Sequence, residues 1–180
     1  MKFLLFSDIH GIIDNLDKIK VLDEKNDFDK VIVLGDLYYT GSVYEHRDKD
    51  VNPVYVRNFL NSFGDKLICL KGNYESATDI ENSEFPIISD LSLIYVDGLN
   101  LYLTHGNNYN YRNSDVIPEG GILIYGHEHV PYIKQNNGKT FISIGSISIQ
   151  IKGKPTYSIY ENRTFKIFDI DDNIIYSVEM

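Results

Sequence analysis

The sequence predicts an α/β protein in which two mixed β-sheets pack together and are flanked by helices. Three observations indicate this class. Short apolar runs end abruptly in small or polar residues, as expected of strands buried on both faces of a mainly parallel sheet. Helix-compatible segments separate these runs in the first half, and hairpin dipeptides separate apolar segments in the second. The 180 residues are enough for one core, so we expect a single domain over residues 1–180.

The first half of the chain predicts three strands separated by two helices. The strands are expected at three apolar runs, residues 3–6, 31–34 and 67–70. Between the first two runs, Leu16, Ile19 and Leu22 give a pattern that is compatible with a helix. Pro53, which follows a capping Asn52, begins a second amphipathic segment that ends before position 64. The order βαβαβ is typical of parallel strands whose carboxyl ends share one edge of the sheet.

The second half predicts a further buried strand and several antiparallel ones. Residues 122–125 form another apolar run that ends in a polar cluster. Two pairs of apolar segments flank Asp97-Gly98 and Asn137-Gly138, which are dipeptides that favour tight hairpin turns. The tail, residues 155–178, alternates apolar and polar residues, which indicates more antiparallel strands.

The composition argues against several functional classes. Lysine and arginine number 17 against 26 aspartate and glutamate residues, a formal net charge of −9, which disfavours binding of duplex DNA or RNA through a basic face. No apolar run approaches the roughly 18 residues of a membrane helix, so no membrane association is expected. Cys69 is the only cysteine, which excludes an intrachain disulfide and favours a cytoplasmic location. It lies within an apolar run and is interpreted as a small core residue.

Four of the five histidines, together with acidic and amide residues, fall in short polar clusters along the chain. Because the carboxyl ends of parallel strands gather along one edge of a sheet, residues far apart in the sequence can meet there. Two carboxylates, four imidazoles and one amide oxygen are close to what two divalent ions sharing a carboxylate require, and they suit Mn²⁺, Fe²⁺, Zn²⁺ or Co²⁺. The candidate ligands are Asp8, His10, Asp36, Asn73, His105, His127 and His129.

In this order, the motifs Asp-x-His-Gly, Gly-Asp, Gly-Asn, His-Gly and Gly-His-x-His resemble those of the calcineurin-like metallophosphoesterase superfamily. Within it, the chain is similar nearly end to end to the small bacterial phosphodiesterases of the YfcE type. The resemblance implies a four-layer α/β/β/α sandwich, in agreement with the two mixed sheets predicted above. It also implies two bound divalent ions, for which we expect Mn²⁺, with Zn²⁺, Fe²⁺, Co²⁺ or Ni²⁺ as alternatives.

The same resemblance divides the candidate ligands between two metal positions. The residues that it implies at the first metal are Asp8, His10 and His129, and those at the second are Asn73, His105 and His127. Asp36 would bridge the two metals. The resemblance thereby implies that Asp36, Asn73 and His105 are catalytic as well as metal-ligating.

Three positions depart from the superfamily pattern. Tyr74, in Gly72-Asn73-Tyr74-Glu75, stands where the superfamily commonly has a His that protonates the leaving alcohol, and where the YfcE type often has Cys. Tyr74 is therefore either a catalytic proton donor or a bystander, and the best activity is expected on diesters with acidic leaving groups. Glu128 replaces a Thr and could support the site or face solvent. Residues 143–146 replace Asn-Pro-Gly-Ser in a supporting loop.

These inferences predict a cytoplasmic phosphodiesterase in which a hydroxide between two metals attacks the phosphorus of a small phosphodiester. One alternative is a phosphomonoesterase or nucleotidase that uses the same site. Another is a non-catalytic scaffold of the same fold. The resemblance makes a homodimer plausible, and the physiological diester and the native metal stay open.

Two further features each have two interpretations. His46 is interpreted as a solvated loop residue, with a role in covering the substrate as the alternative. In residues 107–112, Tyr109 or Tyr111 could stack on a base or aryl ring and Arg112 could meet a phosphate, or the segment could be an exposed loop.

Overall fold

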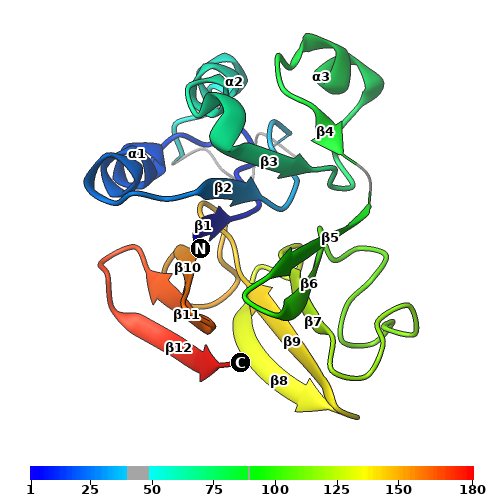
Figure 1. The fold of residues 1–180 in the computed structure, drawn as a ribbon. Helices are drawn as coiled ribbons and strands as arrows, with labels where there is room; N and C mark the ends of the chain where they lie inside the picture. Colours follow the sequence, from blue (N-terminus) through cyan, green and yellow to red (C-terminus); the bar gives the residue numbers. More distant parts are fainter. Residues whose placement is uncertain (40–48, 89) are drawn as a thin grey trace.

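Two β-sheets pack against each other in the computed structural model, which describes residues 1–39, 49–88 and 90–180 (Figure 1). The strands of the larger sheet are β1 (Lys2–Phe6), β2 (Lys30–Val33), β3 (Leu67–Leu70), β4 (Ile87–Ile88), β10 (Thr156–Glu161), β11 (Thr164–Asp169) and β12 (Ile174–Glu179). Those of the smaller sheet are β5 (Leu91–Val96), β6 (Leu99–Thr104), β7 (Ile122–Tyr125), β8 (Pro131–Asn136) and β9 (Lys139–Ile144). The helices are α1 (Leu16–Lys25), α2 (Pro53–Asn61) and α3 (Ala77–Asn82), with a 3₁₀ turn, η1, at Gly64–Lys66. His46 lies outside the described residues.

The larger sheet has the strand order β12-β11-β10-β1-β2-β3-β4. Its β1, β2, β3 and β4 are parallel, and β10, β11 and β12 continue the sheet in antiparallel pairs. In β1, Leu4 pairs with Val31 on one side and with Ile159 on the other, and all three side chains pack in the core under the helices. The predicted parallel strands and the predicted antiparallel tail are both confirmed.

The smaller sheet has the order β5-β6-β7-β9-β8, with β6, β7 and β9 parallel. Two hairpins, β5–β6 and β8–β9, form its edges, and their turns lie where the sequence predicts them. Asp97 and Gly98 both have positive φ, as do Asn137 and Gly138. Positive φ at both central residues matches the twist of a two-residue hairpin, and Asn-Gly and Asp-Gly reach it at little cost.

Alternating side chains of the larger sheet supply two separate cores. Phe3 and Leu5 of β1 face the smaller sheet and pack with Leu101 and Leu103 of β6. Leu4 and its neighbours on the opposite face pack against α1 and α2. Because every second side chain of β1 enters one core and the rest enter the other, the strand is fully apolar from Phe3 to Phe6.

The helices begin at recognisable caps. Asn52 accepts a hydrogen bond from the backbone of Tyr55 at 3.0 Å, and Pro53 opens α2 as the sequence predicts. The sequence analysis does not predict α3, which is only six residues long and buries none of its side chains. A capping box between Ser76 and Asp79 marks its start and is the signal that could have located it.

The outer face of the smaller sheet is covered by residues 105–121, which contain no helix. Ile117 from this segment is buried against Leu123, Tyr125 and Phe141 of the sheet. The ring of Tyr111 stands edge-on to that of Phe141, with 5.2 Å between centroids. The two mixed sheets are therefore confirmed, whereas the fourth layer of the sandwich is an irregular segment and not a layer of helices.

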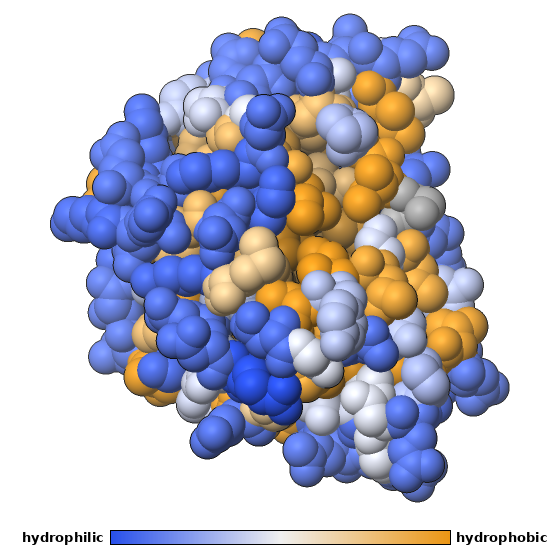
Figure 2. Space-filling model, viewed as in Figure 1, coloured by the Kyte–Doolittle hydropathy of each residue, from blue (hydrophilic) through white to orange (hydrophobic). Residues whose placement is uncertain are grey.

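Apolar side chains reach the surface where β4 and β5 lie at the edges of the two sheets (Figure 2). Ile88 and Ile94 are only partly buried there, and Leu93 is 55% exposed.

Among the described residues, no helix is long and apolar enough to cross a membrane.

We expect the irregular fourth layer to be a packed part of the core. Replacing Ile117, which is 1% exposed, by Ala should lower the free energy of unfolding by about 2–5 kcal/mol, because the cavity that it leaves cannot fully close. The neighbouring Val116 is 48% exposed, and Val116→Ala should cost less than about 0.5 kcal/mol. Urea unfolding of both variants measures the difference, and equal small effects would show that the segment is not packed.

Candidate metal centre

The polar clusters singled out in the sequence follow strand ends in both sheets. Asp8 and His10 follow β1, Asp36 follows β2, Asn73 follows β3, His105 follows β6, and His127 and His129 follow β7. The strands β1, β2 and β3 are parallel to one another, as are β6 and β7. Their carboxyl ends meet at one place, so residues more than 100 positions apart in sequence come within hydrogen-bonding distance of one another.

Asp8, His10 and His129 form a first group, whose ligand atoms all lie within 4.8 Å of one another. Nε2 of His129 lies 3.1 Å from Oδ1 of Asp8 and 3.2 Å from Nε2 of His10. Asp8 is fully buried. The three residues are those that the resemblance assigns to one metal.

Asp36, His105 and His127 form a second group of the same kind. Nε2 of His105 lies 3.2 Å from Oδ2 of Asp36 and 3.2 Å from Nδ1 of His127. The same nitrogen lies 3.0 Å from Oδ1 of Asn73, which adds an amide oxygen to the group. All seven candidate ligands are thus brought together.

Asp36 lies between the two groups. Its Oδ2 is 3.2 Å from Nε2 of His105 in the second group and 3.8 Å from Nε2 of His10 in the first. Its other oxygen accepts a hydrogen bond from the backbone N–H of Tyr74 at 3.1 Å. This position suits a bridging carboxylate, and the bridging role itself stays a prediction.

Backbone carbonyls fix which ring nitrogen three of the histidines present to the site. Nδ1 of His10 lies 2.6 Å from the carbonyl oxygen of Tyr39, and Nδ1 of His105 lies 2.7 Å from that of Leu34. Nδ1 of His129 is held in the same way by the carbonyl oxygen of Ile149. When Nδ1 donates its proton to a carbonyl, Nε2 of a neutral imidazole keeps a free lone pair, which is the arrangement of metal-ligating histidines.

Many of the candidate ligands have a left-handed backbone. Asp8, His10, Asp36, His127 and His129 all have φ between +51° and +58°. A side chain with a Cβ adopts this conformation at a cost of about 1–3 kcal/mol, and such residues cluster at functional sites. The sharp reversal after each strand points these side chains at one another.

Glu75 ties together the loops that follow β2 and β3. Its carboxylate is buried and accepts hydrogen bonds from the backbone N–H groups of Leu37 at 2.6 Å, Asp36 at 3.1 Å and Gly72. A Cβ on Gly72 would run into the carboxylate of Asp36, so only glycine fits there. Glu75 has no predicted role in the sequence. Its place one residue after Tyr74, within the Gly-Asn motif, is the signal that could have indicated its function at the site.

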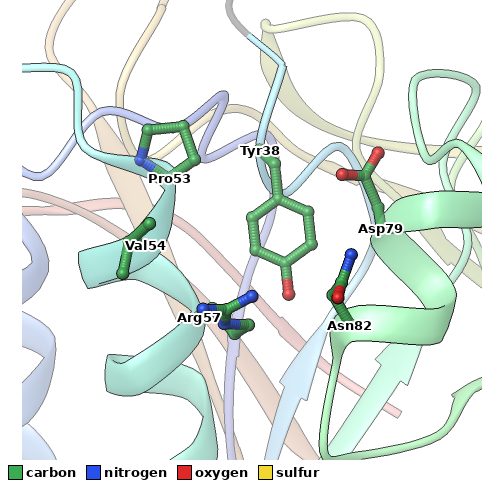
Figure 3. Close-up of a pocket in the computed structure, with 6 residues that line it drawn as sticks. All are labelled: Tyr38, Pro53, Val54, Arg57, Asp79 and Asn82. Atoms are coloured by element: carbon green, nitrogen blue, oxygen red, sulfur yellow. The ribbon is translucent and has the colours of Figure 1, made fainter.

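Tyr38 anchors the same loop between the helices. Its ring stands between α2 and α3, in a cavity of about 100 Å³ lined also by Pro53, Val54, Arg57, Asp79 and Asn82 (Figure 3). Its hydroxyl lies 2.8 Å from that of Ser83. Burial raises the pKa of Tyr38 to about 12, so the hydroxyl keeps its proton. The loop that carries Asp36 is therefore fixed at two points. Glu75 accepts hydrogen bonds from its backbone, and the ring of Tyr38, two residues after Asp36, packs between two helices.

Two serines hold the loop that follows β1. The hydroxyl of Ser146 donates to the carbonyl oxygen of Asp8 at 2.8 Å. The hydroxyl of Ser148 lies 2.7 Å from the same oxygen and 2.9 Å from the carbonyl oxygen of Ile9. Residues 143–146 act as the supporting loop that the sequence predicts, and Ser148 extends this support.

The electrostatics of the site fit bound cations. Burial disfavours the protonated form of His105, but a hydrogen bond to Asp36 and the charge of Asp8 raise its pKa to about 9. Burial likewise opposes a proton on His129, yet Asp8 raises its pKa. Burial alone would raise the pKa of Asp8, but His129 and His105 outweigh it and lower it. Without a metal, protons therefore occupy the space between the acceptors.

Asp8 supplies a specific test of this fit. Its Oδ1 is buried and has no hydrogen-bond partner among the described residues while His129 is neutral, because Nδ1 of His129 holds the single proton. A buried carboxylate oxygen without a donor is costly unless a cation compensates it. The residues present therefore fit a divalent ion beside Asp8 Oδ1, and the nitrogen and oxygen donors suit a transition metal.

The structure places two of the three departures, Tyr74 and Glu128, on different sides of the centre. Tyr74 is 45% exposed, and its ring lies 5.7 Å from that of His10 and 5.0 Å from that of Tyr39. Glu128 is half-buried and borders an open groove beside His127, together with Tyr132. It therefore supports the wall of that groove and does not simply face solvent.

Two other interpretations can be compared with the structure. Cys69 is 1% exposed, and burial raises the pKa of its thiol well above the usual range, which confirms the core assignment. Tyr109 and Tyr111 pack against the outer face of the smaller sheet. Tyr111 meets the ring of Phe141 edge-on, so stacking of Tyr109 or Tyr111 on a base or aryl ring stays a prediction, while Arg112 borders the groove.

A comparison with family models matches residues 1–165 to the calcineurin-like phosphoesterase superfamily domain. The sequence is 27% identical over 176 residues to the phosphodiesterase YfcE of Escherichia coli K12, covering 97% of this chain and 95% of that protein. The solved structure of the E. coli phosphoesterase YfcE superposes with a TM-score of 0.91, at 27% identity, and the match covers 99% of each chain.

More distant solved structures share the fold. A structure described as a novel archaeal phosphodiesterase superposes with a TM-score of 0.68 at 21% identity, with both chains fully covered. Vps29 from Entamoeba histolytica, solved in complex with Zn²⁺, superposes with a TM-score of 0.66 at 17% identity and covers 99% of each chain. At this level of identity the likeness concerns the fold alone.

The three hydrogen bonds of Glu75 predict a role in holding the metal ligands. In Glu75→Gln one oxygen becomes an amide that cannot accept from the backbone, so the Asp36 loop loses part of its support. We expect the affinity for Mn²⁺ to fall by about 10–100-fold, as is typical when the partner of a ligand is removed. Titration of the chelator-treated variant and unmodified protein with Mn²⁺ measures this change in affinity. Glu81→Gln on exposed α3 is the matched control, and equal affinities in the two variants would contradict the role.

Proposed function

The chain belongs to the calcineurin-like phosphoesterase superfamily, and we propose that it is a metal-dependent phosphodiesterase that hydrolyses small phosphodiesters. The family implies divalent metal ions, and the two groups of residues described above could hold them. The similarity to the phosphodiesterase YfcE over 97% of the chain supports a diester as the substrate. The observation on which the proposal depends most is the buried Oδ1 of Asp8, which lies beside two imidazoles and has no donor while His129 is neutral.

Each residue of the centre has a task in this proposal. Asp8, His10 and His129 hold one ion, and Asn73, His105 and His127 hold the other, with Asp36 between them. Two divalent ions, which we take to be Mn²⁺, would supply an attacking hydroxide at neutral pH and neutralise the phosphoryl oxygens. Glu75, Ser146 and Ser148 keep the ligand loops in place, so that little reorganisation is needed when substrate binds.

The charge distribution supports a small anionic substrate. The two carboxylates of the centre offset only half of the charge of two divalent ions, so the loaded centre is positive within a chain of net charge −9. Apart from the buried Glu75, the other acidic residues lie outside the centre and repel long polyanions. A small phosphodiester can reach the positive centre without coming close to the negative charge of the remaining acidic residues. The single buried cysteine suits a reducing, cytoplasmic setting, and a homodimer stays a prediction.

Tyr74 is proposed as the proton donor to the leaving alcohol. Its backbone N–H is fixed on Asp36 and its exposed ring lies against His10, so the side chain is at the mouth of the centre. A phenol is a weaker acid than an imidazolium and serves best where the leaving group needs little help.

The metal ligands provide the direct test of the proposed activity. Asn73→Ala removes the amide oxygen beside His105 and should reduce Mn²⁺-dependent hydrolysis of bis(4-nitrophenyl) phosphate at least 100-fold. Asn82→Ala on α3 removes an amide outside the centre and should turn over like the unmodified protein. Undiminished turnover in Asn73→Ala would overturn the assignment. Faster cleavage of 4-nitrophenyl phosphate than of the diester would favour a monoesterase.

The proton-donor role predicts a leaving-group dependence. Tyr74→Phe keeps the ring but removes the hydroxyl, and should slow hydrolysis of diphenyl phosphate by about 100-fold while slowing that of bis(4-nitrophenyl) phosphate much less. The 4-nitrophenolate ion leaves without a proton, whereas phenolate departs poorly. Steady-state rates on the two substrates measure the ratio, and equal slowing would show that Tyr74 only positions other groups.

A further inference from the structure

An open groove of about 610 Å³ begins at His127 and runs away from the metal centre. The end of β7, the segment 105–121, the strand β8 and the loop after β9 each contribute to it. Its lining residues are Asn110, Arg112, His127, Glu128, Val130, Tyr132, Lys134 and Ile151. Because His127 belongs to the second group of candidate ligands, a molecule whose phosphorus sits at the centre can extend into the groove.

The groove presents two cationic side chains and one carboxylate, so its lining carries a net positive charge. Arg112 and Lys134 are both exposed, and neither has an ion-pair partner within the described part of the chain. Glu128 is the one acidic residue of the lining and offsets one of the two positive charges. In a chain of net charge −9, two free cations beside the centre form a local positive region.

The ammonium group of Lys134 is held in place by two aromatic rings. Nζ of Lys134 lies 4.6 Å from the centre of the Tyr111 ring and 4.3 Å from that of Tyr132, within the range of cation–π attraction. The Tyr132 hydroxyl lies 2.6 Å from that of Tyr125, which accepts the backbone N–H of Tyr111 at 3.2 Å. This network fixes the two rings on which Lys134 rests.

Arg112 belongs to a hydrogen-bonded turn that is fastened to the centre. Asn110 and Asn113 exchange two backbone hydrogen bonds of 3.1 Å around it, and the side chain of Asn110 accepts from the Arg112 N–H at 2.9 Å. The same Asn110 donates to the carbonyl oxygen of Gly106, which adjoins His105. The base of the Arg112 side chain therefore has a fixed position relative to the second group of ligands.

We propose that this groove binds a second phosphate group of the substrate, so that the preferred substrate is a phosphodiester with a phosphate monoester on one of its alcohols. The inference rests on the proposed phosphodiesterase function. A guanidinium fork and an ammonium group together match the doubly charged, three-oxygen end of a phosphate monoester. A groove of this volume has room for a nucleoside-sized spacer between the two phosphates.

Two chromogenic diesters that differ by one phosphate test the proposal. Thymidine 5′-(4-nitrophenyl phosphate) lacks the second phosphate, and its 3′-phosphorylated form has it. We expect kcat/KM to be about tenfold higher for the 3′-phosphorylated diester. In Arg112→Gln/Lys134→Gln the ratio of the two values should fall to about one. Lys20→Gln/Lys25→Gln removes the same charge from α1 and should keep the ratio of the unmodified protein.

Binding of the corresponding nucleotides separates this inference from the proposed function. Thymidine 3′,5′-bisphosphate should bind to the Mn²⁺-treated protein about tenfold more tightly than thymidine 5′-phosphate in equilibrium dialysis, and Arg112→Gln/Lys134→Gln should lose the difference. If the unmodified protein hydrolyses both diesters with equal kcat/KM, or if the double variant keeps the preference, the groove assignment is wrong and the phosphodiesterase stands. If it hydrolyses no diester but binds the bisphosphate selectively, the groove assignment stands and the proposed function fails.

Discussion

The molecule is organised around a group of electron-pair donors that face one another with too few protons between them. Oδ1 of Asp8, Oδ2 of Asp36 and ring nitrogens of four histidines lie only 3.1–3.2 Å from their neighbours. Such an arrangement repels itself unless cations or protons fill it. The protein resists this repulsion through contacts on the far side of each ligand. Backbone carbonyls hold three imidazoles, Glu75 holds the Asp36 loop, and two serine hydroxyls hold the Asp8 loop.

The two sheets serve this arrangement by aligning strand ends. The parallel strands of the larger sheet supply four of the seven candidate ligands, and those of the smaller sheet supply the other three. The apolar core between the sheets, which includes Phe3 and Leu5 on one side and Leu101 and Leu103 on the other, fixes the distance between these two sets of ligands. Close packing makes that distance stiff, because interdigitated side chains do not slide without opening voids. Left-handed turns after β1, β2 and β7 then direct five of the seven candidate ligands across the junction.

Local sequence patterns predict those elements of this molecule whose residue types are restricted by their immediate neighbours along the chain. The fully apolar run of β1 and the Asp97-Gly98 turn are readable because burial on both faces and positive φ each restrict the residue type. The ligand positions are readable because each follows a strand. The irregular fourth layer cannot be predicted in this way, because Ile117 becomes a core residue only when the smaller sheet has formed beneath it. The contacts of Glu75, and the position of Arg112 and Lys134 in one groove, are not readable either, because they depend on chain segments that meet only in the folded structure.

The irregular layer over the smaller sheet joins two properties that helices rarely combine. Residues 105–121 seal an apolar face through Ile117 and also place Arg112 at the groove, whereas His105 at their start and β7 at their end stay anchored in the sheet. Insertions or deletions between these anchors change the reach of the segment without moving a strand. The length of the segment can therefore change, and with it the surface presented at the groove, while the strands that precede the candidate ligands keep their positions.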